Sequence, residues 1–235
     1  MPLDANWVSR TSVYIVRHGQ TEENKQKIIQ GQLDTILNSE GERQADLVAK
    51  TLKDIPFDVC YSSDLQRAAD TAKRILSHHP GVELQTHIAV RERYMGDLQG
   101  HVWEKGVGHI VKNGERKEIQ EPESPQSVKE RAMKWWNETI VGTTASYVLI
   151  VSHGAWIRLL VQGLLEDRSI HAGHRVTVGR CLNTGVSVVK IPRERGRGQL
   201  LQYGNIAHLR EMDVDVAEEN GDESGISQDS EPRRC

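Results

Sequence analysis

The stretch Val13-Tyr14-Ile15-Val16-Arg17-His18-Gly19 predicts more about this 235-residue chain than any other part of its sequence. Its first four residues are β-branched or aromatic, which is typical of a buried strand. An arginine, a histidine and a glycine follow at once, so a turn is expected directly after the strand. In α/β sheets, ligands bind beyond the carboxyl ends of the strands. We therefore expect Arg17 and His18 to lie at a ligand site.

A second stretch repeats this pattern later in the chain. The apolar run Tyr147–Val151 is followed by Ser152-His153-Gly154, and apolar residues at helical spacing come next. Each of the two histidines thus follows a predicted strand and precedes a glycine, whose missing side chain lets a ligand approach the backbone. Both histidines are therefore expected in loops at carboxyl strand ends.

Strands and helices alternate along the chain. Helices are expected after Ser39 and Ser63, each of which has the form of a capping box with the residue three positions on, and from Pro125. The expected strands are Val13–Val16, Phe57–Ser62, Val82–Val90, Tyr147–Val151, Val186–Ile191 and Leu200–Tyr203. This alternation predicts an α/β fold with a mostly parallel sheet and layers of helices. The glycine- and charge-rich stretch 96–123 has no clear period, and we expect a long excursion or lid there.

The composition divides the chain into one domain and a tail. Hydrophobic residues make up 37% of the chain, with 20 glycines besides, which is ordinary for a protein that buries a core. The stretch 211–235 has nine acidic and two basic residues, and since the whole chain carries −3, residues 1–210 carry +4. The tail has too little apolar surface to offset the entropy of ordering. We expect a domain over 1–210 and a disordered acidic tail over 211–235.

Cysteine usage and hydropathy predict the compartment. The three cysteines, Cys60, Cys181 and Cys235, form no metal-type pair, and no hydrophobic leader precedes the first strand. The longest apolar runs are far shorter than the ~18 residues that a membrane span needs. We therefore expect a cytoplasmic protein, with a nuclear location as the alternative. Neither a membrane nor a nucleic acid is expected as a partner, and the oligomeric state stays open.

Two arginines and two histidines make a candidate anion site. Arg17 lies beside His18, and Arg67 is expected in the first turn of the helix after the second strand, where amide groups and the helix dipole favour an anion. Together with His153, these side chains suit a tetrahedral anion such as phosphate. The alternative is that each is an ordinary surface residue at a strand end, which is harder to sustain for all four together.

The sequence offers few ways to do chemistry at such a site. It has no glycine-rich P-loop, no cysteine in an anion-binding loop and no carboxylate cluster for Mg²⁺. An imidazole can be the nucleophile instead, and the neighbouring arginines would favour the neutral form of His18 that this requires. Glu92, after the third predicted strand, is the candidate acid for the leaving oxygen, with Glu22 and Glu23 as competitors.

Four segments occur in an order that resembles a known family. They are Arg17-His18-Gly19-Gln20-Thr21 with Asn24, Gln30-Gly31 and Asp34; Ser62-Ser63-Asp64-Leu65-Gln66-Arg67-Ala68; Glu92-Arg93-Tyr94 with Gly96; and Ser152-His153-Gly154. The chain resembles the histidine phosphatase superfamily, the phosphoglycerate mutase-like proteins, over roughly residues 12–190. The resemblance implies the phosphoglycerate mutase-like fold, a three-layer α/β sandwich.

The resemblance also implies a role for each site residue. His18 would attack phosphorus and become phosphohistidine, and Glu92 would act first as general acid and then as general base. Three further catalytic residues, Arg17, Arg67 and His153, would hold the phosphoryl oxygens and neutralise charge in the transition state. The phosphoryl group would also be bound by Asn24, Gln30, Gly31 and Gly154. No metal ion and no organic cofactor is implied.

Within the family, the sequence is more similar to phosphatases, in particular fungal broad-specificity phosphatases. Mutases that resemble this chain carry an arginine pair and a proline-rich stretch after the third motif, where residues 114–118 and 121–124 differ. We expect a metal-independent phosphomonoesterase that hydrolyses small phosphorylated metabolites, sugar phosphates or similar, through a phosphohistidine. The alternatives are a phosphoglycerate mutase-type phosphotransferase and a noncatalytic phospho-ligand-binding module.

The expected lid carries candidates for substrate contacts. A second phosphate on the substrate could meet basic residues there, and an indole could cover a sugar ring. The candidates are Lys105, Lys112, Arg116, Lys117 and Trp103. The alternative is that these are solvated loop residues.

Overall fold

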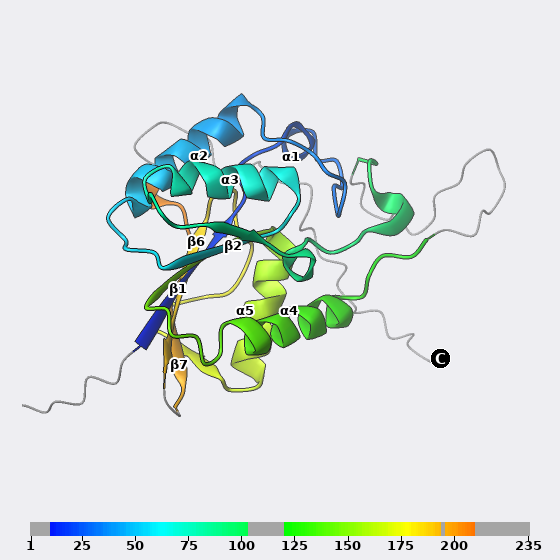
Figure 1. The fold of residues 1–235 in the computed structure, drawn as a ribbon. Coiled ribbons are helices and arrows are strands. Elements are labelled where there is room, and N and C mark those ends of the chain that lie inside the picture. The colour runs from blue at the N-terminus through cyan, green and yellow to red at the C-terminus, as the bar shows by residue number, and fades with distance from the viewer. Residues whose placement is uncertain (1–9, 103–119, 194–195, 210–235) are drawn as a thin grey trace, which may run out of the picture.

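The computed structural model describes residues 10–102, 120–193 and 196–209 (Figure 1). The expected contacts of the lid residues Trp103, Lys105, Lys112, Arg116 and Lys117 lie outside the described residues, and so does the expected tail over 211–235. Those expectations stay predictions.

Seven strands form one sheet in the order β3-β2-β4-β1-β6-β7-β5. The pairs β3–β2, β2–β4, β4–β1 and β7–β5 are parallel, whereas β1–β6 and β6–β7 are antiparallel. The strands are β1 (Arg10–Arg17), β2 (Val59–Ser62), β3 (Leu84–Thr86), β4 (Tyr147–Ser152), β5 (Ile170–Ala172), β6 (Val186–Pro192) and β7 (Gly198–Asn205). The prediction of a mostly parallel sheet is confirmed, and β1 lies at its centre.

Helices cover both faces of the sheet (Figure 1). Two of them pack on one face, α2 (Ser39–Leu52) and α3 (Gln66–Leu76), and two on the other, α4 (Pro125–Thr139) and α5 (Gly154–Glu166). The connections hold a short helix, α1 (Glu22–Lys25), and three 3-10 turns, η1 (Ile88–Val90), η2 (Gly96–Leu98) and η3 (Ala207–Leu209). The three-layer α/β fold is confirmed. Among the described helices, none is both long enough and apolar enough to cross a bilayer.

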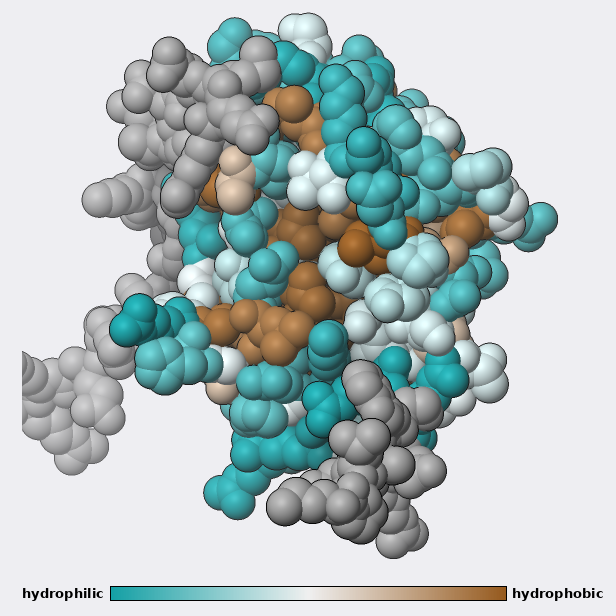
Figure 2. All heavy atoms as spheres, turned by 90° about the vertical axis from the view of Figure 1, so that its left-hand side faces the viewer, coloured by the Kyte–Doolittle hydropathy of each residue, from teal (hydrophilic) through white to brown (hydrophobic). Residues whose placement is uncertain are grey.

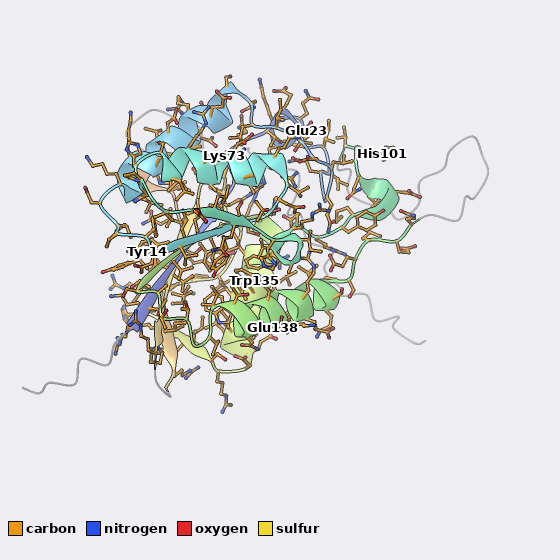
Figure 3. All side chains as sticks on the ribbon, viewed as in Figure 1. Tyr14, Glu23, Lys73, His101, Trp135 and Glu138 are labelled. Carbon is orange, nitrogen blue, oxygen red and sulfur yellow. The ribbon has the colours of Figure 1, made fainter. Side chains whose placement is uncertain are left out.

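The side chains of β1 alternate between the two helical layers. Val13 and Ile15 belong to the hydrophobic cluster that includes residues of α4 and α5, whereas Val16 packs with residues of α2 and α3. Figure 3 shows Trp135 on the side of α4 that faces the sheet and Glu138 on its outer side. On the face turned to the viewer in Figure 2, a band of hydrophobic residues crosses the middle between hydrophilic groups. Burial on both faces explains the continuous apolar runs of the central strands.

Two helices begin with caps that differ from the prediction. α2 starts at Ser39, but its capping residue is Asn38, whose side chain accepts the N–H of Gly41. α3 starts at Gln66 without a side-chain cap, and the Ser63 hydroxyl accepts the N–H of Leu65 instead. Both capping-box predictions are therefore wrong. In α2 the preceding residue already supplies the oxygen, and in α3 the serine lies too far ahead of the first helical turn.

The third strand is shorter than predicted. Within the expected Val82–Val90, the residues Leu84–Thr86 pair with β2, and the chain then turns into η1. β3 is an edge strand, so it pairs with β2 alone and can end early. η1 contacts the end of β4, where the Ser152 hydroxyl donates to the Val90 carbonyl at 2.7 Å. The short elements α1 and β5 were not predicted.

Candidate active site

Three central strands end side by side and deliver the predicted residues to one place. β1 and β4 pair in register up to Arg17 opposite Ser152, and the backbone N–H of His18 continues the ladder to the Ser152 carbonyl at 3.0 Å. β2 ends beside β4 at Ser62, just before the residues that lead into α3. The rings of His18 and His153 are 5.1 Å apart between centroids. The expected convergence of the two histidines at carboxyl strand ends is thus observed.

His18 is fully buried, and its ring is oriented by its own loop. Nδ1 lies 2.7 Å from the Gly19 carbonyl, and because a carbonyl can only accept, the proton is on Nδ1. Within the described part of the chain, Nε2 has no hydrogen-bond partner. Burial, and then the charges of Arg67 and Arg17, hold the pKa of His18 well below its usual range. The ring is therefore neutral, with a lone pair on Nε2.

The two arginines are fully buried and are oriented by neutral oxygens. Arg17 donates from Nη1 to the Cys181 carbonyl at 2.7 Å. Arg67 donates from Nη2 to the Gly31 carbonyl at 2.8 Å and from Nη1 to the Leu33 carbonyl at 2.6 Å. A carbonyl partner orients a guanidinium without cancelling its charge.

The loop between α1 and α2 binds the side chain of Arg67. The Gln30 side chain accepts the hydroxyl hydrogen of Thr35, and Thr35 in turn accepts from Arg67 Nη1 at 3.3 Å. Gly31, whose carbonyl also accepts from Arg67, has a positive φ of 52°, a conformation that favours glycine. Gln30 and Gly31 thus orient Arg67, and their direct contact with a phosphoryl group stays a prediction.

Glu92 is almost fully buried, and its carboxyl group lies at the start of α5. Its Oε1 accepts the N–H of Arg93 at 2.7 Å and of Trp156 at 3.2 Å, and its Oε2 accepts the N–H of Ala155 at 3.1 Å. The carboxyl group therefore lies beside His153, which immediately precedes the helix. Of the competing acids, Glu22 is exposed and binds Gln26, which directly follows α1, and Figure 3 shows Glu23 toward the outer edge of the molecule.

His153 faces the same enclosure as His18. It is fully buried, and among the described residues neither ring nitrogen has a hydrogen-bond partner. Burial comes first among the causes that hold its pKa well below the usual range, followed by the positive charge of Arg67 and, more weakly, that of Arg17. A neutral imidazole keeps one N–H, which can donate to an oxygen of a bound anion. Gly154, the first residue of α5, is buried next to it, and its contact with phosphate stays a prediction.

A family model described as the histidine phosphatase superfamily (branch 1) matches residues 13–206. The chain belongs to the histidine phosphatase superfamily. A broad-specificity phosphatase of Saccharomyces cerevisiae is 31% identical to this histidine phosphatase over 218 residues, covering 88% of this chain and 90% of the yeast protein. A metal-independent phosphoserine phosphatase of Arabidopsis thaliana is 30% identical over 209 residues, covering 85% and 83% of the two chains.

Mutases and a solved phosphatase structure are also similar. A phosphoglycerate mutase of Schizosaccharomyces pombe is 31% identical over 199 residues, covering 74% of this chain and 87% of the mutase. A mutant phosphoserine phosphatase of Entamoeba histolytica in complex with phosphoserine superposes with a TM-score of 0.66 at 27% identity. That alignment covers 85% of this histidine phosphatase and 99% of the amoebal chain. The resemblance to fungal broad-specificity phosphatases is confirmed.

One residue of the site, Asn183, was not predicted from the sequence. The Asn183 side chain donates to the His18 carbonyl at 3.0 Å and to Asn24 Oδ1 at 3.2 Å. Asn24 Oδ1 also accepts the N–H of Thr21, in a capping box that starts α1. Asn183 therefore connects the backbone of His18 to the side chain of Asn24. A signal was available, since the turn residues Asn183-Thr184-Gly185 directly precede the predicted strand Val186–Ile191.

The antiparallel direction of β6 explains how this loop reaches the site. β6 pairs with β1 up to Val186 opposite Val16, so the amino end of β6 meets the carboxyl end of β1. Thr184 has a positive φ of 53°, which is rare for a β-branched residue, and its N–H donates to the His18 carbonyl at 3.2 Å.

Over the described residues, no group of three or more His, Cys, Asp or Glu side chains could hold a metal ion.

Proposed function

We propose that the domain over residues 1–210 hydrolyses phosphate monoesters without a metal ion, through a phosphohistidine at His18. The observation that carries this proposal is the state of the His18 ring. It is buried and neutral, with its proton on Nδ1 toward Gly19 and its lone pair on Nε2, and the buried arginines Arg17 and Arg67 are near enough for their charges to lower its pKa. An imidazole held in this way is an activated nucleophile next to an anion site.

In the first step, Nε2 of His18 attacks phosphorus and the bond to the leaving oxygen breaks. The electron pair of that bond goes to the leaving oxygen, which takes a proton from the carboxylic acid of Glu92. Arg17, Arg67 and the N–H of His153 bind the equatorial oxygens as charge builds up on them. Asn24, together with Gln30, Gly31 and Gly154, completes the phosphate-binding set. The products are phosphohistidine, an alcohol and a Glu92 carboxylate.

In the second step, water hydrolyses the phosphohistidine. Glu92, now a carboxylate, takes a proton from water while the water oxygen attacks phosphorus. The bond between phosphorus and Nε2 breaks, and its electron pair returns to the imidazole. Inorganic phosphate leaves, His18 is neutral again, and Glu92 is again a carboxylic acid. The two steps therefore restore every group without a metal ion or an organic cofactor.

We propose small phosphorylated metabolites, taken with broad specificity in the cytoplasm, as the substrates. The names of two similar proteins support this class, since one is a broad-specificity phosphatase and the other was solved in complex with phosphoserine. Mutases among the relatives make phosphoglycerate mutase activity the second candidate. A mutase has to return the phosphoryl group to its substrate, whereas a phosphatase passes it to water.

Hydrolysis of p-nitrophenyl phosphate in the presence of a chelator tests the proposal. We expect hydrolysis in the wild type, none in His18→Ala, and a phosphoryl label on His18 that is labile to acid. Efficient interconversion of phosphoglycerates with negligible hydrolysis would establish the mutase instead. Phosphate binding without any turnover would establish a noncatalytic binding module.

A further inference from the structure

Arg131, on α4, joins this helix to the segment that carries Glu92. Its guanidinium donates to the carbonyl oxygens of Ala89 at 2.9 Å, Arg91 at 2.8 Å and Glu92 at 2.9 Å. Three carbonyls that bind one guanidinium fix the path of the backbone over residues 89–92. Other side chains bind single carbonyls of this segment, since the Trp156 indole donates to Ala89 at 2.9 Å, Ser152 to Val90 at 2.7 Å and Gln32 to Glu92 at 3.0 Å, whereas Arg131 binds three of them at once.

Glu123 completes this arrangement from the residues just before α4. Its carboxylate binds Arg131 with two contacts, at 2.8 Å and 3.1 Å, and accepts the N–H of Tyr94 at 3.2 Å. Its own carbonyl accepts from Arg93 Nε at 2.6 Å. Burial alone would raise the pKa of the Glu123 carboxyl, but the hydrogen bonds from Arg131, Tyr94 and Ser127 outweigh burial and lower it. Glu123 is therefore ionised, and together with Arg131 it holds the backbone on both sides of Glu92.

The carboxyl group of Glu92 is held separately, by the amides at the start of α5. Glu92 is thus fixed at its backbone from α4 and at its carboxyl group from α5. We propose that Arg131, with Glu123 as its partner, is a positioning residue that holds the Glu92 carboxyl group where it can protonate the leaving oxygen. This inference rests on the proposed function.

Loss of this anchor has a specific chemical consequence. A displaced Glu92 hinders the transfer of its proton to the leaving oxygen while the bond to phosphorus breaks. An alkoxide needs that proton, whereas a dinitrophenolate leaves without it. The defect should therefore depend on the leaving group. A general loss of folding or of phosphate binding would instead affect all esters equally.

The test compares kcat/KM for glycerol phosphate and for 2,4-dinitrophenyl phosphate, because kcat/KM includes formation of phosphohistidine but not its hydrolysis. In Arg131→Met we expect about a 10- to 100-fold loss on the alkyl ester and less than about a 3-fold loss on the aryl ester. Arg131→Lys keeps the positive charge but not the planar set of guanidinium donors, so its kcat/KM for the alkyl ester should lie between those of Arg131→Met and the wild type. Glu123→Gln should show the same dependence on the leaving group if Arg131→Met does not fold.

Lys129→Met is the matched control. Lys129 lies on the same helix and binds Glu166 of α5 at 2.7 Å, so its loss also removes a contact between α4 and α5. We expect no difference between the two esters in this variant. Glu92→Gln serves as the reference for complete loss of the acid.

The outcomes separate the inference from the proposed function. Equal losses on both esters in Arg131→Met and Glu123→Gln, with a leaving-group effect in Glu92→Gln, would overturn the positioning role and leave the proposed function intact. Equal losses on both esters in Glu92→Gln would overturn the assignment of Glu92 as the acid, and the positioning role with it. A leaving-group effect in Glu92→Gln and Arg131→Met, absent from Lys129→Met, supports the inference.

Discussion

Acidification from about pH 7 to about pH 5 should destabilise this fold through His18 and His153. Burial, and then nearby arginine charges, hold the pKa of both groups well below the ordinary ~6.5. Both rings stay neutral in the folded chain, while each takes up a proton in the unfolded chain. Because the unfolded state binds more protons, the free energy of unfolding falls as the pH falls. Each ring should lower it by about 2 kcal/mol over this interval, and the pair by about 4 kcal/mol.

Urea denaturation at the two pH values measures this loss. His153→Gln removes one of the two groups, so the pH-dependent loss should shrink by about 2 kcal/mol, whatever the variant does to stability at neutral pH. His171→Gln, which replaces an exposed histidine on β5, is the control and should leave the loss unchanged. An identical loss in the wild type and in His153→Gln would refute the reasoning.

Three substitutions test other parts of the site. Arg67→Met should lower kcat/KM for p-nitrophenyl phosphate by about 100- to 1,000-fold. It should also move the acid limb of the pH profile to higher pH, because His18 loses a nearby positive charge that lowers its pKa. Gly31→Ala should lower the free energy of unfolding by about 1 to 3 kcal/mol in urea denaturation, because its φ is 52° and the new Cβ would lie 2.4 Å from Gln99 Oε1. Asn183→Leu should lower the free energy of unfolding by about 1 to 3 kcal/mol and reduce turnover in a p-nitrophenyl phosphate assay. Asn183→Asp keeps the shape of the side chain but removes its N–H donor, so this variant separates the effect of the donor from the effect of shape.

Residues whose position depends on local pattern could be predicted from the sequence. His18 and His153 each follow an apolar run and precede a glycine, so the strand ends alone indicated their location. Arg67 was predicted at the start of its helix even though the cap proposed for that helix is wrong, because the apolar stripe fixes the helix to within a turn. Glu92 was selected from several acids by its place after a strand.

Residues that act through packing between distant elements could not be predicted. The role of Asn183 depends on β6 running antiparallel to β1, and no local pattern states the direction of a strand. Arg131 lies on α4 among other charged residues of an amphipathic helix, and its contacts with residues 89–92 depend on how α4 packs beside η1. The early end of β3 likewise follows from its place at the edge of the sheet.

The buried guanidinium groups of Arg17 and Arg67 also affect the stability of the enzyme. Their mutual repulsion is relieved when an anion enters, so the reaction product itself is a ligand that stabilises the native state. Inorganic phosphate at a hundredfold excess over its dissociation constant would add about 2.7 kcal/mol to the free energy of unfolding. The same ligand competes with substrate, so the protein should be most resistant to heat in the conditions that inhibit it most.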